Sequence, residues 1–322
     1  MTRWFTVLAA LALSLASPLS RAQADYPTKP VRFVVPFAPG GTTDILARIM
    51  AEHYTQAFKQ TFIVDNRAGA GGNLGAAEVA KAAPDGYTIM MGTPGTQSIN
   101  QFLYATMPYN PEKDFAPVIY VARVPNVLVV HPSLGVKSLK ELIDRARAKP
   151  GSINFATPGN GTTGHLSTEL LKSMTKIDLV HVPYKGSGPA LQDLLAGQVQ
   201  MTIDNLPSAM SFIKAGKLVA LGVTTSQRVA ALPDVPTIAS VVPGYEASSW
   251  FVIVAPAATP EPIVAKLNAE GNRILKKPEV RERFAQLGAD PIGGTPQDLA
   301  KHMAAETAKW KEVVRVSGAK VD

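Results

Sequence analysis

Residues 31–58 read VRFVVPFAPGGTTDILARIMAEHYTQAF, and this stretch decides the fold. An apolar run, Val31–Phe37, passes into a short segment rich in Pro, Gly and Thr, and a stretch with helical spacing, Thr43–Phe58, follows. A short apolar run bounded by turn-forming residues is typical of a buried strand. A strand that leads directly into a helix indicates an α/β fold, in which helices connect the strands of a sheet.

The same alternation continues along the chain. Further strands are expected at Thr61–Asp65, Tyr87–Met91, Val118–Val130, Ile153–Thr157, Leu179–Tyr184, Met201–Asp204, Leu218–Thr224 and Trp250–Ala255. Further helices are expected at Leu74–Ala83, Ser138–Ala148, Gly164–Thr175, Ala190–Ala196, Pro207–Lys214, Pro262–Lys276, Pro278–Leu287 and Pro296–Val316. Several of these helices begin near Pro, Thr or Ser and end near Gly, as helices commonly do. The pattern predicts an α/β fold with mostly parallel sheets, covered by helices on both faces.

The chain is predicted to form two domains. The long apolar run Ala116–His131 is interrupted at residues 123–126, which indicates a strand that leaves one sheet and enters another. A second crossing is expected within Leu218–Ala255. Two crossings predict a discontinuous domain 1 (residues 25–123 and 225–322) and a continuous domain 2 (residues 124–224). The crevice between two such domains is a common place for a ligand.

The first 24 residues have the pattern of a signal peptide. Arg3 precedes the apolar run Trp4–Ala16, and Ala22-Gln23-Ala24 is a small-x-small cleavage pattern. The apolar run is shorter than the roughly 20 residues that a membrane-spanning helix needs. We therefore expect export and cleavage after Ala24.

Composition and motifs argue against several function classes. The chain has no cysteine, so a disulfide, a thiolate nucleophile and a Cys metal site are excluded. Its net charge of +7 is spread along the chain, whereas nucleic-acid binding calls for a clustered basic face. The five histidines lack the spacing of metal ligands. Gly69–Gly75 resembles a dinucleotide motif, but Leu74 occupies the place of its last glycine. No metal, cofactor or nucleic-acid partner is expected.

Ligands of open α/β sheets bind beyond the carboxyl ends of the strands, so the loops there are candidates. Four such segments, residues 36–44, 92–100, 157–165 and 204–205, are rich in Gly, Thr, Ser or Asn. Glycines let backbone N–H groups approach a ligand, and a helix N-terminus favours negative charge. A tight turn with a capped helix explains the first loop equally well. The candidate ligand-binding residues are Phe37, Pro39, Gly40, Gly41, Thr42, Thr43, Gly92, Thr93, Thr96, Ser98, Thr157, Asn160, Gly161, Thr162, Thr163, His165, Asp204 and Asn205.

Two of these candidates are titratable, and each has a structural alternative. His165 either contacts the ligand or acts as a cap or a packed residue. Asp204 either accepts a hydrogen bond from an amine or hydroxyl of the ligand, or caps the helix that follows.

Several stretches of the chain, in order, resemble one known family. These are VVPFAPGGTTD (Val34–Asp44), NRAGAGGNLG (Asn66–Gly75), PDGY (Pro84–Tyr87), SLKELI (Ser138–Ile143), Asn154–His165, HVPYKGSGPALQ (His181–Gln192) and LPDVPT (Leu232–Thr237). The chain resembles the Bug proteins, the TctC-type extracytoplasmic solute receptors of tripartite tricarboxylate transporters. One departure is Ala68, where the family often has Pro.

The resemblance implies a two-domain Venus-flytrap fold of the type II-like periplasmic class and a periplasmic receptor for small carboxylates: di- and tricarboxylates, amino acids or aromatic acids. It implies that the loops Phe37–Thr43 and Thr157–Thr163 hold a carboxylate with the help of bridging waters, and that residues 93–100 and 204–205 vary with the ligand. The partners would be the membrane permease subunits, and we expect a monomer without catalytic residues.

Two alternatives stay open at this stage. The first is a sensor that presents the closed receptor to a membrane signalling partner. The second is an exported hydrolase, for which His165 beside Thr162 or Thr163 is the best pair that the sequence offers. No third group that would orient such a pair is evident.

The loops contain few cations. Residues 36–44 hold one charged side chain, Asp44, and residues 157–165 hold only His165 as a titratable group. Lys185 is the one nearby cation, and it lies in a tight Pro-Tyr-Lys-Gly turn. For a carboxylate ligand, this predicts binding by backbone N–H groups and hydroxyls, without an arginine clamp.

Overall fold

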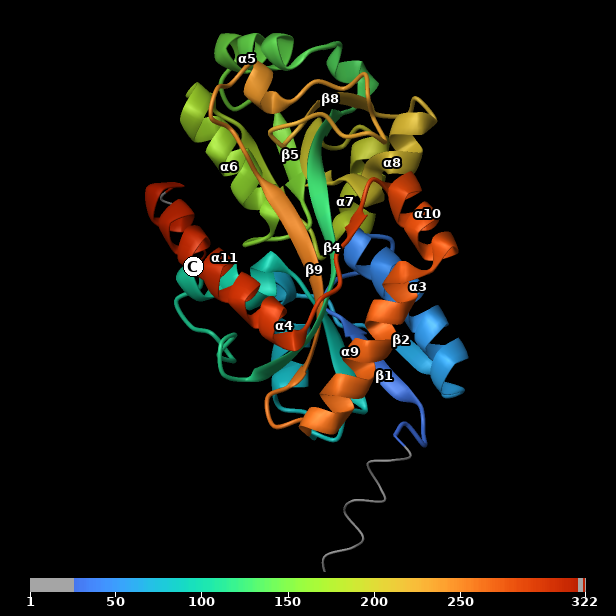
Figure 1. Ribbon diagram of the computed structural model, residues 1–322. Coiled ribbons are helices and arrows are strands. Elements are labelled where there is room, and N and C mark those ends of the chain that lie inside the picture. Colours follow the sequence, from blue (N-terminus) through green and yellow to red (C-terminus); the bar gives the residue numbers. More distant parts are fainter. Residues whose placement is uncertain (1–25, 318–320, 322) are drawn as a thin grey trace, which may run out of the picture.

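The computed structural model describes residues 26–317 and residue 321, so the expected signal peptide and its cleavage after Ala24 lie outside the described residues. The strands form one continuous path across the molecule (Figure 1). Its order is β2 (Phe62–Asn66), β1 (Val31–Val35), β3 (Thr88–Gly92), β9 (Ser248–Pro256), β4 (Phe115–Val130), β7 (Met201–Asn205), β5 (Asn154–Thr157) and β6 (Val180–Pro183). Two further strands, β8 (Val219–Val223) and β10 (Asp290–Pro291), pair with β4.

Helices cover both faces of this path. They are α3 (Thr42–Phe58), α4 (Asn73–Ala80), α5 (Leu139–Ala148), α6 (Thr163–Thr175), α7 (Ser187–Leu195), α8 (Leu206–Lys214), α9 (Glu261–Lys276), α10 (Pro278–Leu287) and α11 (Pro296–Ser317). Short helical turns add η1 (Ala70–Gly72), η2 (Gly95–Ile99), η3 (Asn100–Phe102), η4 (Pro132–Leu134) and η5 (Ile238–Ser240). The predicted elements are all present, with ends shifted by a few residues. The segment η2 differs in type from the prediction, because it is a π-helical turn where the sequence indicated a loop.

The long strand β4 passes from one half of the molecule to the other. Its first part pairs with β9, as far as Pro125 opposite Ser248, and its last residues, Asn126–Val130, pair with β7 and β8. We call the half built on β1–β3, β9 and β10 the first lobe, and the half built on β5–β8 the second lobe. Figure 1 shows β4 and β9 running side by side between them.

Both lobes have mixed sheets. The pairs β1–β2, β1–β3, β5–β6 and β5–β7 are parallel, whereas β4 and β9 pair with their neighbours in the antiparallel sense. The α/β class is as predicted, but the expected parallel majority is not found, since the antiparallel pairs among the described strands are at least as numerous as the parallel ones. The reason is that a strand leaving a lobe and the strand returning to it lie side by side in opposite directions. Parallel pairing is therefore confined to the strands that lead into helices.

Alternate residues of the strands supply the cores on the two faces of each lobe. In the first lobe, Phe33 packs on the side of α3 and α9, whereas Val34 packs with Trp250 on the other face. In the second lobe, Leu128 and Val127 are divided in the same way. Strands buried on both faces read as continuous apolar runs. Helices therefore cover the faces, and the carboxyl ends of the strands are left to form a site.

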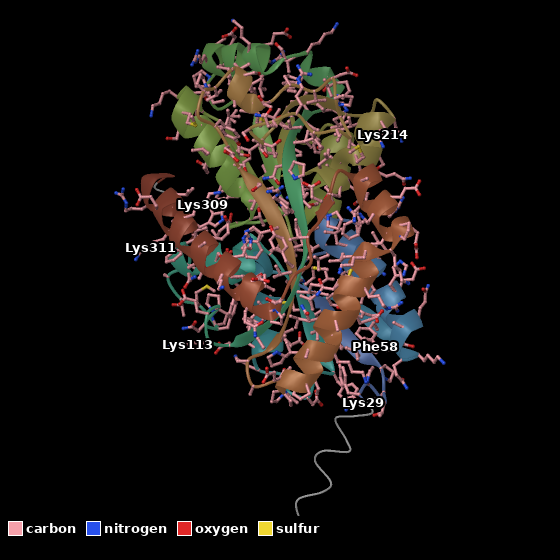
Figure 2. The ribbon with its side chains drawn as sticks, in the orientation of Figure 1. Lys29, Phe58, Lys113, Lys214, Lys309 and Lys311 are labelled. Carbon is pink, nitrogen blue, oxygen red and sulfur yellow. The ribbon has the colours of Figure 1, made fainter. Side chains whose placement is uncertain are left out.

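The C-terminal helix α11 connects the lobes. Trp310 and Val314 of α11 share an apolar cluster with Ile99 and Leu103 of the first lobe and with Leu166 of the second. Figure 2 shows Lys309 and Lys311 close together on α11, whereas Lys214 and Lys29 lie far from them, in the upper and lower parts of the view. Within the described ranges, none of the helices has the length and apolar character that a bilayer-crossing segment requires.

Candidate ligand-binding site

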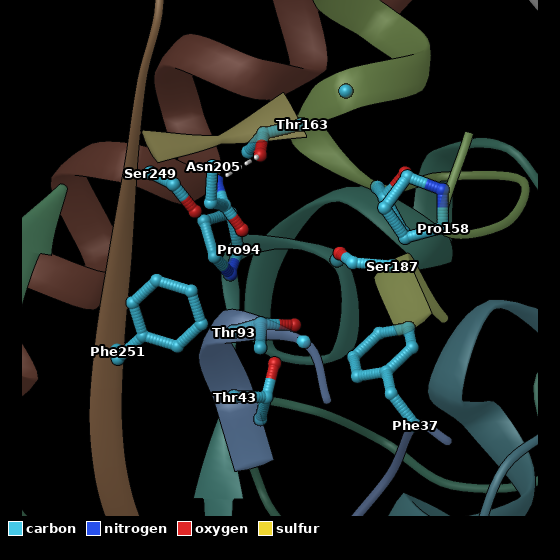
Figure 3. A pocket seen from close by; sticks show the side chains of 14 residues that line it. Phe37, Thr43, Thr93, Pro94, Pro158, Thr163, Ser187, Asn205, Ser249 and Phe251 are labelled. Atoms are coloured by element: carbon cyan, nitrogen blue, oxygen red, sulfur yellow. Dashed lines mark hydrogen bonds between the residues drawn. The ribbon is translucent and has the colours of Figure 1, made fainter. Parts of the chain in front are cut away.

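A small cavity lies between the lobes, beyond the carboxyl ends of the strands that lead into helices and beside the start of β9 (Figure 3). Its volume of about 30 Å³ is enough for about two water molecules. A larger ligand therefore requires the lobes to separate. The lining residues are Phe37, Gly41, Thr43, Thr93, Pro94, Gly95, Ser249 and Phe251 from the first lobe, and Pro158, Thr162, Thr163, Gly164, Ser187 and Asn205 from the second.

Four helices begin at this cavity. Gly41 is the N-cap of α3 and Thr162 that of α6, while Ser187 is the first residue of α7 and Asn205 the N-cap of α8. The first N–H groups of a helix have no partner within it, and the aligned peptide dipoles place partial positive charge there. The arrangement therefore offers hydrogen-bond donors to an anion without a formal cation.

None of the residues that line the cavity carries an ionisable side chain. Lys185, the one nearby cation noted in the sequence, is exposed, and its backbone oxygen accepts a hydrogen bond from the N–H of Ala38 at 2.8 Å. Its main-chain contact therefore connects the lobes. Phe37 and Phe251 supply aromatic surface to the lining of the cavity (Figure 3).

The loop Phe37–Thr43, which we call the first loop, is supported by a buried carboxylate. Asp44 accepts hydrogen bonds from the N–H of Gly40 at 3.1 Å and from the amide of Asn66 at 3.1 Å, and it forms an ion pair with Arg48 at 2.9 Å. Burial by itself raises the pKa of Asp44, but the hydrogen bonds from Arg48, Gly40 and Asn66 outweigh it and hold the pKa below its usual value. The carboxylate thus stays charged and fixes the turn.

The loop Thr157–Thr163, which we call the second loop, is supported by two stacked histidines. The rings of His165 and His181 lie 4.4 Å apart and 10° from parallel, and Phe155 stacks on the far side of His181 at 4.8 Å. Nδ1 of His165 accepts from the N–H of Gly161 at 3.3 Å, and Nε2 of His181 lies 2.6 Å from the hydroxyl of Thr157. Each ring therefore contacts one end of the loop.

Both histidines are neutral in this setting. Burial lowers the pKa of His165 to about 4, and the charge of Lys172 acts in the same direction. Burial also lowers the pKa of His181 to about 4, helped by His165 and Lys172 and opposed by Glu169. A neutral His165 can accept from Gly161 through Nδ1, whereas a charged imidazolium cannot.

Asp204 lies behind the cavity wall and is 1% exposed. Its Oδ1 accepts from the hydroxyl of Ser187 at 3.0 Å and from the N–H of Asn205 at 2.7 Å. Its Oδ2 is buried without a partner. Burial raises the pKa of Asp204 to about 7, although the hydrogen bonds from Ser187 and Asn205 act against this.

The lobes touch on both sides of the cavity. Thr42 donates its N–H to Oγ of Ser208 across the cleft at 2.8 Å. A Cβ added to Gly188 would lie 2.1 Å from the carbonyl oxygen of Pro39, and one added to Gly71 would lie 2.1 Å from that of Asn160. Glycine therefore permits the close approach of the backbones, and the structure is in a closed arrangement.

Seven of the predicted residues line the cavity: Phe37, Gly41, Thr43, Thr93, Thr162, Thr163 and Asn205. Others lie where the lobes meet. Thr42 bonds to Ser208, Gly40 and Pro39 face Gly188, Asn160 approaches Gly71, and Gly161 approaches Asn100. The structure brings these residues into the closed interface and not into the lining.

The remaining predicted residues have contacts within their own lobe. Thr96 bonds to Thr93, Ser98 accepts from Thr307, and Gly92 lies against Gln97 and Val252. Thr157 and His165 belong to the support of the second loop, and Asp204 lies behind the wall.

Sequence reasoning missed seven lining residues: Pro94, Gly95, Pro158, Gly164, Ser187, Ser249 and Phe251. Four of them, Pro94, Gly95, Pro158 and Gly164, lie inside loops that were already candidates. Ser187 begins a helix whose start was predicted at Ala190, so its place at the strand end was hidden. Ser249 and Phe251 lie on a strand, and only the register of β9 beside β4 brings them to the cleft.

Comparisons with known proteins identify the family. The model of the tripartite tricarboxylate transporter family receptor, TctC, matches residues 46–319. Protein BugT of Bordetella pertussis is 40% identical over 326 residues, which cover 100% of this chain and 99% of BugT. A protein of Pseudomonas sp. strain P51, encoded in the tcbD-tcbE intergenic region, is 41% identical over 312 residues, which cover 96% of this chain and 93% of the relative.

Solved structures agree. An R. palustris protein with adipate has a TM-score of 0.90 at 46% identity, over 92% of this chain and 100% of that one. MatC from Rhodopseudomonas palustris with bound malate has a TM-score of 0.86 at 37% identity, over 90% and 100%. The periplasmic binding protein BugD has a TM-score of 0.89 at 34% identity, over 92% and 99%. The chain belongs to the TctC family of tripartite tricarboxylate transporter receptors, and it is a periplasmic solute-binding protein of that family, not an enzyme.

Proposed function

We propose that the chain captures a small organic acid between its lobes, as a monomer, and presents the closed complex to the permease subunits of a tripartite transporter. The observation that carries the ligand class is the cavity where α3, α6, α7 and α8 begin, with no ionisable side chain in its lining. The relatives solved with adipate and with malate support a small dicarboxylic acid as the ligand.

The first and second loops are the proposed carboxylate site. A desolvated carboxylate is costly unless several donors satisfy it. The helix N-termini at Gly41 and Thr163 supply backbone N–H groups, and Thr43 and Thr163 add hydroxyls. Each charge-assisted hydrogen bond contributes roughly 1.5–3 kcal/mol. Bridging waters would let the same groups accept acids of different length.

Closure is the proposed motion. We propose that residues 25–123 and 225–322 move as one domain and residues 124–224 as the other, about the neighbouring strands β4 and β9. The cavity of about 30 Å³ supports this, because a ligand larger than two waters enters only when the lobes part. Small-angle scattering should show a smaller radius of gyration when an acid is bound, and an unchanged radius at saturation would contradict the motion.

A thermal-shift screen tests the ligand class. The purified mature protein is heated with mono-, di-, tri- and aromatic carboxylates, and with uncharged amides of the same skeletons as matched controls. A ligand at about 100 times its Kd stabilises the native state by about 2.7 kcal/mol, which is readily measured. Stabilisation by at least one acid and by no amide supports the proposal. No response to any acid, or an equal response to the amides, contradicts it.

A further inference from the structure

The hydrogen bonds around Asp204 determine what two cavity residues can offer a ligand. Ser187 has one hydroxyl proton, and it is donated to Oδ1 of Asp204 at 3.0 Å. Asn205 has two side-chain amide protons, which are directed to Oδ1 of Asn126 at 2.5 Å and, more weakly, to Oγ1 of Thr163 at 3.5 Å (Figure 3). Both residues line the cavity. With their protons engaged, the atoms left for a ligand are lone pairs on Ser187 Oγ and Asn205 Oδ1.

Asp204 strengthens this acceptor character. Its side chain is 1% exposed, and its Oδ2 is buried without a hydrogen-bond partner. Among the ion pairs between described residues, none includes Asp204. A buried carboxylate without a cation is costly. When Asp204 is ionised, its charge therefore favours a hydrogen-bond donor or a positive charge, and disfavours a carboxylate, beside Ser187 and Asn205.

Other groups of the cavity have the opposite character. Thr163 accepts the weak hydrogen bond from Asn205 through Oγ1, so its hydroxyl proton is free to be donated. The N-termini of α3 and α6 add backbone donors. The cavity thus has donors that suit a carboxylate, at the N-termini of α3 and α6. It also has acceptors that disfavour a carboxylate, at Ser187 and Asn205.

We propose that the acid bound by this protein carries a hydroxyl or ammonium group near its carboxylate, and that Ser187 and Asn205, backed by Asp204, recognise that group. The ligand class is then a hydroxy acid or an amino acid in preference to a plain diacid. This inference rests on the proposed capture of an organic acid and specifies its substituent. Asp204 acts through its neighbours, so it is a positioning residue that tunes their polarity.

Calorimetric titration with succinate, malate and aspartate tests the substituent, because the three acids share one four-carbon skeleton and differ by a hydrogen, a hydroxyl and an ammonium. Glutarate, 2-hydroxyglutarate and glutamate repeat the comparison one carbon longer. In the series that binds, the hydroxy or amino acid should bind at least about tenfold more tightly than the plain diacid. In Asp204→Asn this ratio should fall to about threefold or less.

A ligand-independent readout keeps the test interpretable. If Asp204 is an ionised carboxylate without a partner for Oδ2, Asp204→Asn should raise the urea concentration at the midpoint of unfolding at mildly alkaline pH. The reason is that the substitution removes the buried charge and keeps the shape of the side chain. If Asp204 served only to hold the start of α8, the variant should lower the midpoint and weaken all acids equally.

Each outcome decides one claim. A plain diacid that binds as tightly as its hydroxy and amino analogues overturns the inference and leaves the proposed function intact. An Asp204→Asn variant that keeps the full ratio also overturns it. Failure of every acid in the broad carboxylate screen as well as in both series counts against the proposed function itself.

Discussion

The two loops proposed to hold the ligand have the same plan and different supports. Each follows a buried parallel strand, contains Pro and Gly, and ends in Thr at the start of a helix. In the first loop the N–H of Gly40 is fixed by the charged Asp44, which is paired with Arg48. In the second loop the N–H of Gly161 is fixed by neutral His165, which is stacked on His181. Two loops of the same plan are thus supported by charge in one lobe and by neutral rings in the other.

The difference separates the pH responses of the two lobes. The pKa of Asp44 is held below its usual value, so the support of the first loop is present above the ordinary aspartate pKa. The pKa of His165 is lowered to about 4, so the support of the second loop is full above the ordinary histidine pKa, about 6.5, and is lost as pH falls through about 4. As pH falls from the ordinary histidine pKa toward the ordinary aspartate pKa, the support of the second loop is therefore lost before that of the first.

The largest expected loss of affinity comes from a substitution that keeps the lobes apart without changing a residue of either loop. In Gly188→Ala the new Cβ would lie 2.1 Å from the carbonyl oxygen of Pro39, so the lobes cannot close fully. Affinity for the acid should fall by about 100-fold. The unfolding free energy should change by less than about 1 kcal/mol, because alanine suits a helix.

The matched control for this variant is Gln192→Ala on the exposed side of the same helix, which should leave affinity unchanged. Calorimetry and urea unfolding measure both quantities. An affinity for Gly188→Ala within about threefold of wild type would show that closure is not needed.

Removal of the charged support should come next. Asp44→Ala leaves the N–H of Gly40 and the amide of Asn66 without their partner, and we expect a loss of about 1–3 kcal/mol in unfolding free energy. Affinity should fall by about tenfold. Arg48→Met, at a side chain that is 55% exposed, should cost much less. Equal losses in the two variants would mean that the ion pair, and not the hydrogen bond to Gly40, supports the loop.

Acidification should sharpen the comparison. Between about pH 7 and about pH 4, the unfolding free energy of Asp204→Asn should fall on the order of 2 kcal/mol more than that of the double variant with His165→Gln, in which the neutral amide still accepts from Gly161. Asp204 acts in the opposite direction, since its raised pKa gives stability that is full below the ordinary aspartate pKa and lost as pH rises through about 7. The measurement is therefore made in an Asp204→Asn background.

Gln192→Ala, at an exposed residue outside both loops, is the control for the acid response. It should keep the wild-type pH dependence. A His165→Gln variant that also keeps the full dependence would contradict the role assigned to the stacked rings.

The smallest effects concern single hydroxyls and the absence of an arginine clamp. Thr43→Val and Thr163→Val should each lower affinity by about fivefold to tenfold, whereas Lys185→Met should change it by less than about twofold. Affinity should depend only weakly on salt, because no exposed cation is used. A strong salt dependence, or a larger loss in Lys185→Met than in the threonine variants, would point to a cation at the site.

The sequence was sufficient where one local pattern decides one local structure. An apolar strand followed by Gly and Thr predicted the turn and the helix start at both loops, since these depend on neighbouring residues. The π-helical turn at Gly95–Ile99 was missed because its small and polar residues show no helical periodicity. The crossing of β4 was visible as an apolar run too long for one sheet.

Contacts between distant segments could not be predicted in the same way. His181 showed no metal-ligand spacing, and its role depends on the register of β5 and β6, which places it opposite Phe155. Phe251 contributes to the cleft only because β9 lies beside β4. The missing partner of Asp204 is likewise visible only when every neighbouring atom is placed.

A crystal structure with a bound acid would show directly whether helix N-termini and hydroxyls hold a carboxylate between the lobes. We expect a carboxylate between the first and second loops, within hydrogen-bonding distance of backbone N–H groups of α3 and α6 or of waters bound to them. Thr43 and Thr163 should take part. An arginine or lysine side chain in a bidentate pair with that carboxylate would contradict the claim, as would an acid bound outside the cleft.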